Sequence, residues 1–337
     1  MSLRDAILTA LRGDEVPAAV LEAAFGEIAD GKAGPAACAG LLVALRAKGE
    51  TVGEIVAAAR ALRSRALRAP RVNRRAIDTC GTGGDGAGTF NVSTAAAFVV
   101  AGAGIPVAKH GNRAASGRAG SIDVLEALGV RCEIPLERAA EILAQVGIAP
   151  FFARVAHPAM RHLAPVRAEL GVRTIANCLG PLLNPVGVRL QMVGVYAQDL
   201  VLPLASALGR LGAERALVVH GSDGLDEVTT TGPTHAALLE QGSVKMLALD
   251  AAALGVARAE PADLRGGDAG RNAEIVRGVL AGERGPCRDI VCVNAAAALF
   301  VARAAPDLAA CLRLACESVD SGAARERLAK LVEATAA

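Results

Sequence analysis

The sequence predicts an α/β protein in which a small all-helical N-terminal domain precedes a larger, doubly wound, mostly parallel α/β domain. Residues 2–68 show helical spacing of apolar side chains throughout. Further along, short β-branched runs alternate with alanine-rich helical stretches, which is the order expected of parallel strands joined by helices. A length of 337 residues also suits two domains better than one.

The helical domain is assigned to residues 1–70. Pro35 can open a helix that runs to "LRAKGE", and "TVGE" forms a capping box in which Thr51 caps the next helix and Glu54 reaches back. The first helix places four apolar side chains on one face: Leu3, Ile7, Leu8 and Leu11. The stretch from Phe151 to Pro185 is also helix-forming, so we expect helices from about 155–185 to pack back on this domain.

The α/β domain is assigned to residues 71–337. Its expected strands are the β-branched runs "RAID" at 75–78, "GIPVAK" at 104–109, "GVRCEI" at 129–134, "QMVGVYA" at 191–197 and "RALVVHG" at 215–221. Each is followed by text that favours a loop or a helix. This alternation predicts strands whose carboxyl ends meet at one edge of a sheet.

Composition excludes several classes of function. Lys and Arg exceed Asp and Glu by 36 to 34, a balance too even for an electrostatic grip on nucleic acid or an anionic membrane. No apolar run reaches the roughly 18 residues of a membrane span. The eight cysteines are scattered without a CxxC, which argues against a zinc site or a disulfide framework and favours core residues in a cytoplasmic protein.

The stretch "DTCGTGGDGAGTFNVST", Asp78 to Thr94, follows an expected strand and precedes an expected helix that Ser93 or Thr94 could cap. A glycine loop in this setting presents backbone N–H groups and a helix N-terminus to an anion, which predicts a phosphate cradle. It matches neither GxxxxGK[ST] nor GxGxxG with its distant acid. Asp85 and Ser93 suggest a phosphate bridged by a metal, or a ribose hydroxyl.

A second polar cluster, "VAKHGNRAASGRAGS", follows the strand-like "IPVA". We expect a glycine-bearing loop here in which Lys109 supplies a point charge for phosphate and the serines supply small donors. Its polar members are Lys109, His110, Asn112, Arg113, Ser116 and Ser121.

Five segments together resemble the anthranilate phosphoribosyltransferases, relatives of the nucleoside phosphorylases: "GTGGDGAGTFNVST", "KHGNR", "SIDVLEALG", "PVRAELGVRTIANCLGPLLNP" and "SDGLDE". They occur in the family's order and spacing, and "LRAKGET" extends the resemblance into the helical domain. Gly117, Ala119 and Ala176 are smaller than the side chains that many members carry there.

The resemblance implies that the chain transfers the phosphoribosyl group of 5-phosphoribosyl 1-pyrophosphate (PRPP) to anthranilate in tryptophan biosynthesis, as a homodimer that uses Mg²⁺. It implies Mg²⁺ ligands at Ser93, Asp226 and Glu227. The anthranilate pocket would contain Gly81, His110, Asn112, Arg167 and Pro181. PRPP would be bound by Gly81, Gly84, Asp85, Thr89, Asn91, Val92, Ser93, Thr94, Lys109, Ser116, Gly117 and Ser121.

Two alternatives stay open on the sequence alone. A pyrimidine nucleoside phosphorylase shares the layout but has a "KxSGRG"-like second loop where this chain has "KHGNR". A catalytically silent relative that binds nucleic acid would show a basic surface and a damaged acidic pair, whereas Asp226 and Glu227 are both present here.

Overall fold

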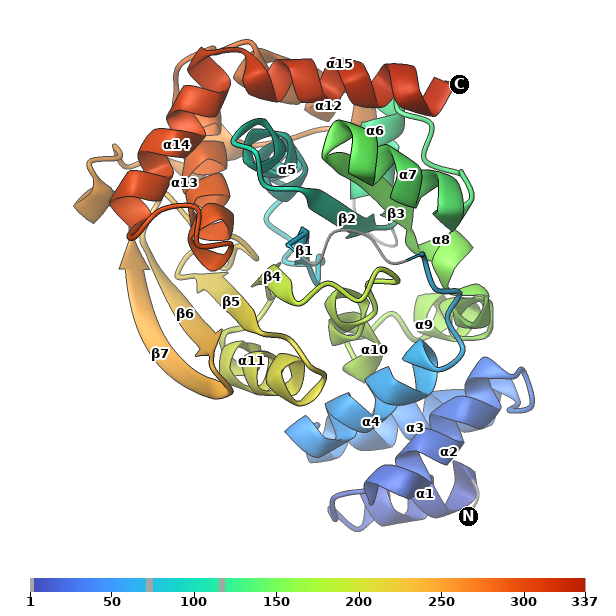
Figure 1. Cartoon of the computed structure of the whole chain (residues 1–337). Helices are drawn as coiled ribbons and strands as arrows, with labels where there is room; N and C mark the ends of the chain where they lie inside the picture. The colour runs from blue at the N-terminus through green and yellow to red at the C-terminus, as the bar shows by residue number, and fades with distance from the viewer. Residues whose placement is uncertain (1–2, 71–74, 115–118, 337) are drawn as a thin grey trace.

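The computed structural model describes residues 3–70, 75–114 and 119–336. A group of helices from the N-terminal part of the chain lies beside a seven-stranded sheet that has helices on both faces (Figure 1). The predicted fold class is therefore confirmed. Within the described ranges, no helix is both long and apolar enough to cross a membrane.

The first part of the chain folds into four helices: α1 (Leu3–Leu11), α2 (Ala18–Ala29), α3 (Pro35–Lys48) and α4 (Val52–Arg63). Pro35 is the first residue of α3, and Thr51 and Glu54 form the expected capping box at the start of α4. Later helices, α9 (Ala164–Leu170) and α10 (Ile175–Cys178), share one hydrophobic core with these four. On α1, Leu3 is buried, but Leu8 and Leu11 are exposed.

The sheet has the order β3-β2-β1-β4-β5-β6-β7. Neighbouring strands from β3 to β5 are parallel, whereas β6 and β7 extend the sheet as an antiparallel hairpin. The strands are β1 (Ile77–Gly81), β2 (Val107–Gly111), β3 (Ile148–Phe152), β4 (Leu190–Gly194), β5 (Arg215–Gly221), β6 (Pro233–Glu240) and β7 (Ser243–Asp250).

The structure corrects two expectations about strands. "GVRCEI" forms no strand, because Val130 and Cys132 are buried beside helices and the segment only connects two of them. Phe151 and Phe152 belong to β3 and not to helix-forming text, since both side chains are buried and the strand pairs with β2 along its length.

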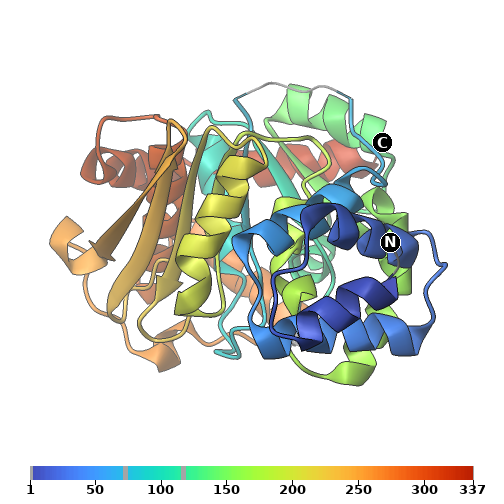
Figure 2. The ribbon, with the colours of Figure 1, turned by 90° about the horizontal axis from the view of Figure 1, so that it is seen from below.

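Helices cover both faces of the sheet. One core holds α5 (Val92–Gly102), α6 (Ser121–Ala127), α7 (Leu136–Val146), α12 (Ala269–Leu280), α13 (Pro286–Val301), α14 (Leu308–Asp320) and α15 (Ala323–Ala336). On the other face, α11 (Val201–Arg210) lies between the sheet and α4 (Figure 2). The short α8 (Ala153–Ala156) follows β3 directly.

The parallel strands β1, β2, β4 and β5 each end in a glycine, at Gly81, Gly111, Gly194 and Gly221. In the register of the sheet, Gly81 lies opposite Gly194. This edge is therefore free of bulky side chains where the chain leaves each strand. Loops and ligands can approach the backbone closely there.

The helical part depends on a buried carboxylate. Glu54 is fully buried, accepts backbone N–H bonds from Val16 and Thr51, and pairs with Lys48 Nζ at 2.8 Å. Glu54→Ala is expected to lower the free energy of unfolding by about 3 kcal/mol, since it leaves a buried ammonium unpaired. Thr51→Ala should remove about 1 kcal/mol through the cap alone. Urea unfolding measures both.

Glu22 provides the matched control, because its pair with Arg60 is long and solvent-exposed. Glu22→Ala should change stability by less than about 0.5 kcal/mol. Equal losses for Glu22→Ala and Glu54→Ala would contradict a structural role for the buried carboxylate.

Candidate active site

The glycine-rich loop leaves the end of β1 at Gly81 and enters α5 at Val92. Gly83 has a positive φ of 63°, which only glycine adopts without strain, and its N–H donates to Asp226 Oδ2 at 2.8 Å. The expected side-chain cap is wrong. Asn91 holds the N-cap position without a capping bond, and Ser93 N–H instead donates to Glu227.

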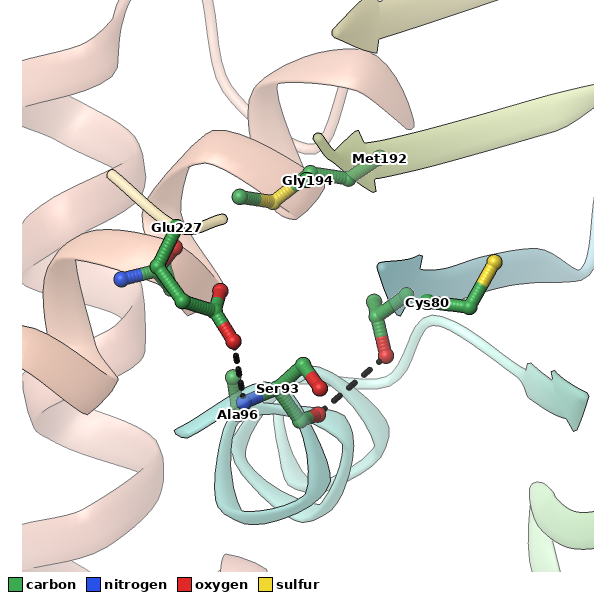
Figure 3. A pocket seen from close by; sticks show the side chains of 8 residues that line it. Cys80, Ser93, Ala96, Met192, Gly194 and Glu227 are labelled. Atoms are coloured by element: carbon green, nitrogen blue, oxygen red, sulfur yellow. Dashed lines mark hydrogen bonds between the residues drawn. The ribbon is translucent and has the colours of Figure 1, made fainter. Parts of the chain in front are cut away.

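Asp226 and Glu227 lie on the loop that follows β5. Glu227 Oε1 accepts the Ser93 N–H at 3.0 Å, and the side chain points to the start of α5 (Figure 3). A side chain on Gly194 would collide with the Asp226 carbonyl, so β4 must end in glycine for this loop to pass. A small pocket lies between the end of β1, the start of α5 and this acidic loop. It is lined by Thr79, Cys80, Ser93, Ala96, Met192, Gly194, Glu227 and Asn294.

Helix α13 contacts the acidic loop through the side chain of Asn294. Asn294 of α13 accepts the Val228 N–H at 2.9 Å and donates to the Val228 carbonyl at 2.9 Å. Its amide also bonds Ile290 of its own helix. The loop carrying Asp226 and Glu227 is thus held by the Asn294 side chain at Val228 and by the Gly83 and Ser93 N–H groups at its two carboxylates.

The carboxylates of Asp226 and Glu227 have lost hydration, and each lies near another acidic side chain. Burial, with the nearby Asp85, raises the pKa of Asp226 to about 7. Burial and then the charge of Asp226 raise the pKa of Glu227 well above its usual range. A cation bound between them would relieve both effects.

The donor set suits Mg²⁺. Carboxylate and hydroxyl oxygens are hard ligands, and Mg²⁺ commonly takes one or two carboxylates together with substrate phosphates and water. Asp226 and Glu227 supply the carboxylates, and Ser93 offers a hydroxyl beside them. Among the described residues no three His, Cys, Asp or Glu side chains gather as a complete metal site.

Lys109 ends the strand expected at 104–109, but the sequence also predicts that it acts from the loop that follows. The structure places both Lys109 and His110 within β2, and Lys109 is only 2% exposed. Its Nζ donates to the Thr79 carbonyl at 2.7 Å. Burial lowers the pKa of Lys109, while the charges of Asp78, Glu227 and Asp226 oppose that shift.

Sequence reasoning missed a buried hydrogen-bond network next to this site, formed by Asp78 and Asn184. Asp78 accepts from the His110 N–H at 3.2 Å and from Asn184 Nδ2 at 2.9 Å. The same amide donates to the Ala108 carbonyl, so it joins β1, β2 and the segment before β4. Asp78 opens the glycine-rich motif, but nothing in the sequence around Asn184 signals this contact.

The expected acceptor residues are only partly brought together. His110 bonds the Gly180 backbone, next to Pro181, and its Nε2 lies 3.2 Å from Nε2 of the buried His157. Asn112 lies past β2, where its carbonyl accepts from Ile122 N–H and Ser121 Oγ. Arg167 on α9 keeps a buried Nε with no hydrogen-bond partner among the described residues. Across those same residues, no hydrogen bond or ion pair joins Arg167 to His110 or Asn112.

The other expected PRPP contacts lie along the same loops. The Gly84 carbonyl accepts a hydrogen bond from Arg173, and the Asp85 carboxylate accepts one from the Ala87 N–H. Thr89 forms a bridge with Arg265, and Asn91 bonds Ala119 and Asn272. Val92 and Thr94 are buried at the start of α5. Ser116 and Gly117 lie outside the described residues.

The buried histidines make the fold sensitive to acid. Burial lowers the pKa of His157 from 6.5 to about 4, so the unfolded chain binds the proton more tightly. The stability that this neutral histidine contributes is present above pH 6.5 and is lost as the pH falls towards 4. At pH 5 the loss is about 2 kcal/mol. We expect His157→Gln to narrow the difference in Tm between pH 7 and pH 5.

His162, which is partly exposed on the neighbouring turn, supplies the control. His162→Gln should leave the acid sensitivity of Tm as it is in the parent protein. The same narrowing in both variants would refute the assignment to His157.

Comparison with known proteins gives a consistent result. Residues 4–66 match the helical bundle domain of a glycosyl transferase family, and residues 73–325 match its a/b domain. The chain is 55% identical to the anthranilate phosphoribosyltransferase of Rhodospirillum rubrum over 92% of this chain and 89% of that one. It is 52% identical to that of Rubrobacter xylanophilus, over 98% and 96%.

Solved structures agree with the sequence relatives. The anthranilate phosphoribosyltransferase of Thermus thermophilus superposes with a TM-score of 0.93 at 45% identity, covering 99% of this chain and 100% of that one. That of Saccharomyces cerevisiae, in complex with PRPP and Mg, gives 0.90 at 26% identity, covering 99% and 98%. Together with the geometry above, these matches show that the chain belongs to the glycosyl transferase family as a member of its anthranilate phosphoribosyltransferase group.

Proposed function

We propose that the protein transfers the phosphoribosyl group of PRPP to the amine of anthranilate and releases pyrophosphate, with Mg²⁺ at Ser93, Asp226 and Glu227. One observation carries this proposal. The buried carboxylate of Glu227 and the half-buried one of Asp226 are held by backbone N–H groups against a glycine loop that leads into a helix. The relatives named above include a yeast enzyme in complex with PRPP and Mg and the same enzyme in complex with 4-fluoroanthranilate.

The reaction needs charge neutralisation more than a nucleophile. Breaking the bond to C1 of the ribose leaves negative charge on pyrophosphate and positive character on the sugar. Mg²⁺ supplies charge that stabilises the departing diphosphate. The chain's part is to position the diphosphate with backbone N–H groups of residues 81–94, and to keep Asp226 and Glu227 in place through the bonds from Gly83 and Ser93.

Lys109 contributes from beneath the loop. Its ammonium is buried between Asp78, Asp226 and Glu227, where it lowers the repulsion among the acids. Ser121 at the start of α6, and Ser116 and Gly117, would complete the PRPP contacts from the second loop.

The acceptor pocket is assigned to Gly81, His110, Asn112, Arg167 and Pro181. The unpaired Nε of Arg167 supports this, because a buried guanidinium donor without a partner among the described residues favours a ligand carboxylate. Burial lowers the pKa of His110 to about 3, so it stays neutral at physiological pH and can line an aromatic pocket without charge. We assign it no proton transfer.

The acidic pair gives the first test of the function. In the double variant Asp226→Ala/Glu227→Ala, kcat/KM is expected to fall by at least about 100-fold, because charge on the leaving diphosphate is no longer neutralised. Tm without ligands should be unchanged or slightly higher, since two acids whose charged forms are disfavoured in the folded chain are removed. Loss of anthranilate fluorescence in the presence of PRPP and Mg²⁺ measures turnover.

Exposed acids make the control. Glu141 on α7 and Glu214 just before β5 both lie on the surface, and Glu141→Ala/Glu214→Ala should keep full turnover. A variant lacking Asp226 and Glu227 that worked at the parent rate in limiting Mg²⁺ would overturn the metal assignment.

A variant of Arg167 should affect the binding of anthranilate and not that of PRPP. Arg167→Ala should raise the KM for anthranilate by roughly 30- to 1,000-fold, the loss of about 2–4 kcal/mol expected for a charge-assisted pair, and leave the KM for PRPP nearly unchanged. Arg161→Ala, which removes an exposed guanidinium from the preceding turn, is the control. Equal effects of Arg167→Ala on both KM values would point to a different role.

We also propose a cytoplasmic homodimer formed through the helical part. Three large apolar side chains on α1 and α3 face solvent: Leu8 at 44%, Leu11 at 67% and Val43 at 44% exposure. Such a patch on a small helical unit indicates an interface. The eight cysteines are free, as suits a reducing compartment.

The assembly has its own test. Sedimentation at micromolar concentration should give a dimer, and Leu8→Lys/Leu11→Lys should give a folded monomer. Leu67→Lys, at an exposed apolar residue outside α1 and α3, should leave the dimer intact. A parent protein that sediments only as a monomer would refute the proposal.

A further inference from the structure

Two helices that lie behind the active site carry a pair of cysteines that the reaction does not use. Cys292 is on α13 and Cys316 is on α14, and the two helices pack side by side, joined by a short connection (Figure 1). Cys292 is buried, whereas Cys316 is partly exposed. Both sulfurs are free thiols.

An ion pair fixes the register of these helices. Arg288 Nη2 of α13 lies 2.7 Å from Asp320 Oδ1 of α14. Cys292 comes four residues after Arg288 and Cys316 four residues before Asp320. In an antiparallel pair of helices, these offsets place the two cysteines opposite each other one turn further along.

The contact between the thiols agrees with this register. Each of the two thiols is the largest influence on the pKa of the other, and Arg288 also acts on both, so the side chains of Cys292 and Cys316 face each other. Helix axes that pack about 8–10 Å apart allow facing cysteines to come within the reach of a disulfide. The chain between the two cysteines would form a closed loop of about 25 residues.

We propose that Cys292 and Cys316 form a redox-active pair that hydrogen peroxide converts into a disulfide between α13 and α14. Cys316 is the attacking thiol, because it is the one that solvent reaches. The other cysteines of the two helices, Cys287 and Cys311, have no comparable partner on the facing helix within the described residues.

The chemistry balances without a further reactant. The Cys316 thiolate attacks one peroxide oxygen, so that an S–O bond forms, the O–O bond breaks and hydroxide leaves. The Cys292 thiol then loses its proton and attacks the Cys316 sulfur, the S–S bond forms, and the oxygen departs as water. Two thiols are oxidised and one peroxide is reduced to two waters.

The electrostatic setting supports the order of these steps. A hydrogen bond from Cys292, and then the charge of Arg288, lowers the pKa of the Cys316 thiol to about 7. The same contact and burial raise the pKa of Cys292. Cys316 therefore has the thiolate needed for attack, and Cys292 keeps its proton until the second step. Asp320 and Asp289 are the acids that oppose the shift at Cys316.

The test uses the full-length protein. Treatment with a small excess of hydrogen peroxide, followed by alkylation and peptide mapping without reductant, should give a peptide pair joined through Cys292 and Cys316. Thiol titration in denaturant should fall by two from the eight of the reduced chain. Tm should rise by about 5 °C and return on addition of dithiothreitol.

Variants of partly exposed cysteines provide the comparison. Cys316→Ser should abolish the cross-link and the rise in Tm, whereas Cys287→Ser on α13 should keep both. A cross-link to any other cysteine, a bond between two chains, or overoxidation of Cys316 with Cys292 still free would overturn the proposal. Mapping of the parent protein decides the matter even if a variant folds poorly.

Discussion

Two backbone N–H groups that hold the carboxylates of Asp226 and Glu227 determine the rest of the site. Gly83 and Ser93 donate to Asp226 and Glu227, and these bonds join the loop after β5 to the loop after β1. For the loops to meet, β4 must pass between them without a side chain, which explains Gly194. The parallel order β1-β4-β5 is what brings the three segments to one edge. The fold thus brings together, from segments far apart in the chain, the residues of the proposed cation site.

Such a site is unfavourable until its ligands arrive. Burial raises the pKa values of Asp226 and Glu227, the charge of Asp85 adds to the rise at Asp226 and the charge of Asp226 to that at Glu227, and Lys109 offsets only part of the rise at Glu227. Nearby hydrogen bonds hold the strands and the acidic loop in place. Asn184 bonds Asp78, and Asn294 separately bonds Val228. Stability contributed there allows the acidic loop to stay in place in an unfavourable electrostatic state, an arrangement typical of functional sites.

The sequence predicts the fold class, the helical part and most parallel strands because periodicity, Pro35 and the Thr51 box are local signals. It fails at "GVRCEI", where burial against helices resembles a strand pattern, and at β3, which pairs with the distant β2. It also omits β6 and β7, a hairpin with local pairing in which no residue of β7 is buried. The acidic pair was predicted from family resemblance, and its contacts follow from topology. Asn184 and the burial of Lys109 within β2 could not be read from neighbouring residues. The assignment of individual ligand contacts stays a prediction.

One contact beside the glycine loop gives the protein an intrinsic fluorescence signal that responds to the loop. The chain has a single tyrosine and no tryptophan. That tyrosine, Tyr196, lies under the Arg173 guanidinium, whose carbon is 4.3 Å from the ring centroid, and the same guanidinium bonds the Gly84 carbonyl. Any rearrangement of the loop that moves Arg173 changes the environment of the only ring that emits as tyrosine. Loop motion in the unlabelled protein is thereby coupled to one spectroscopic signal.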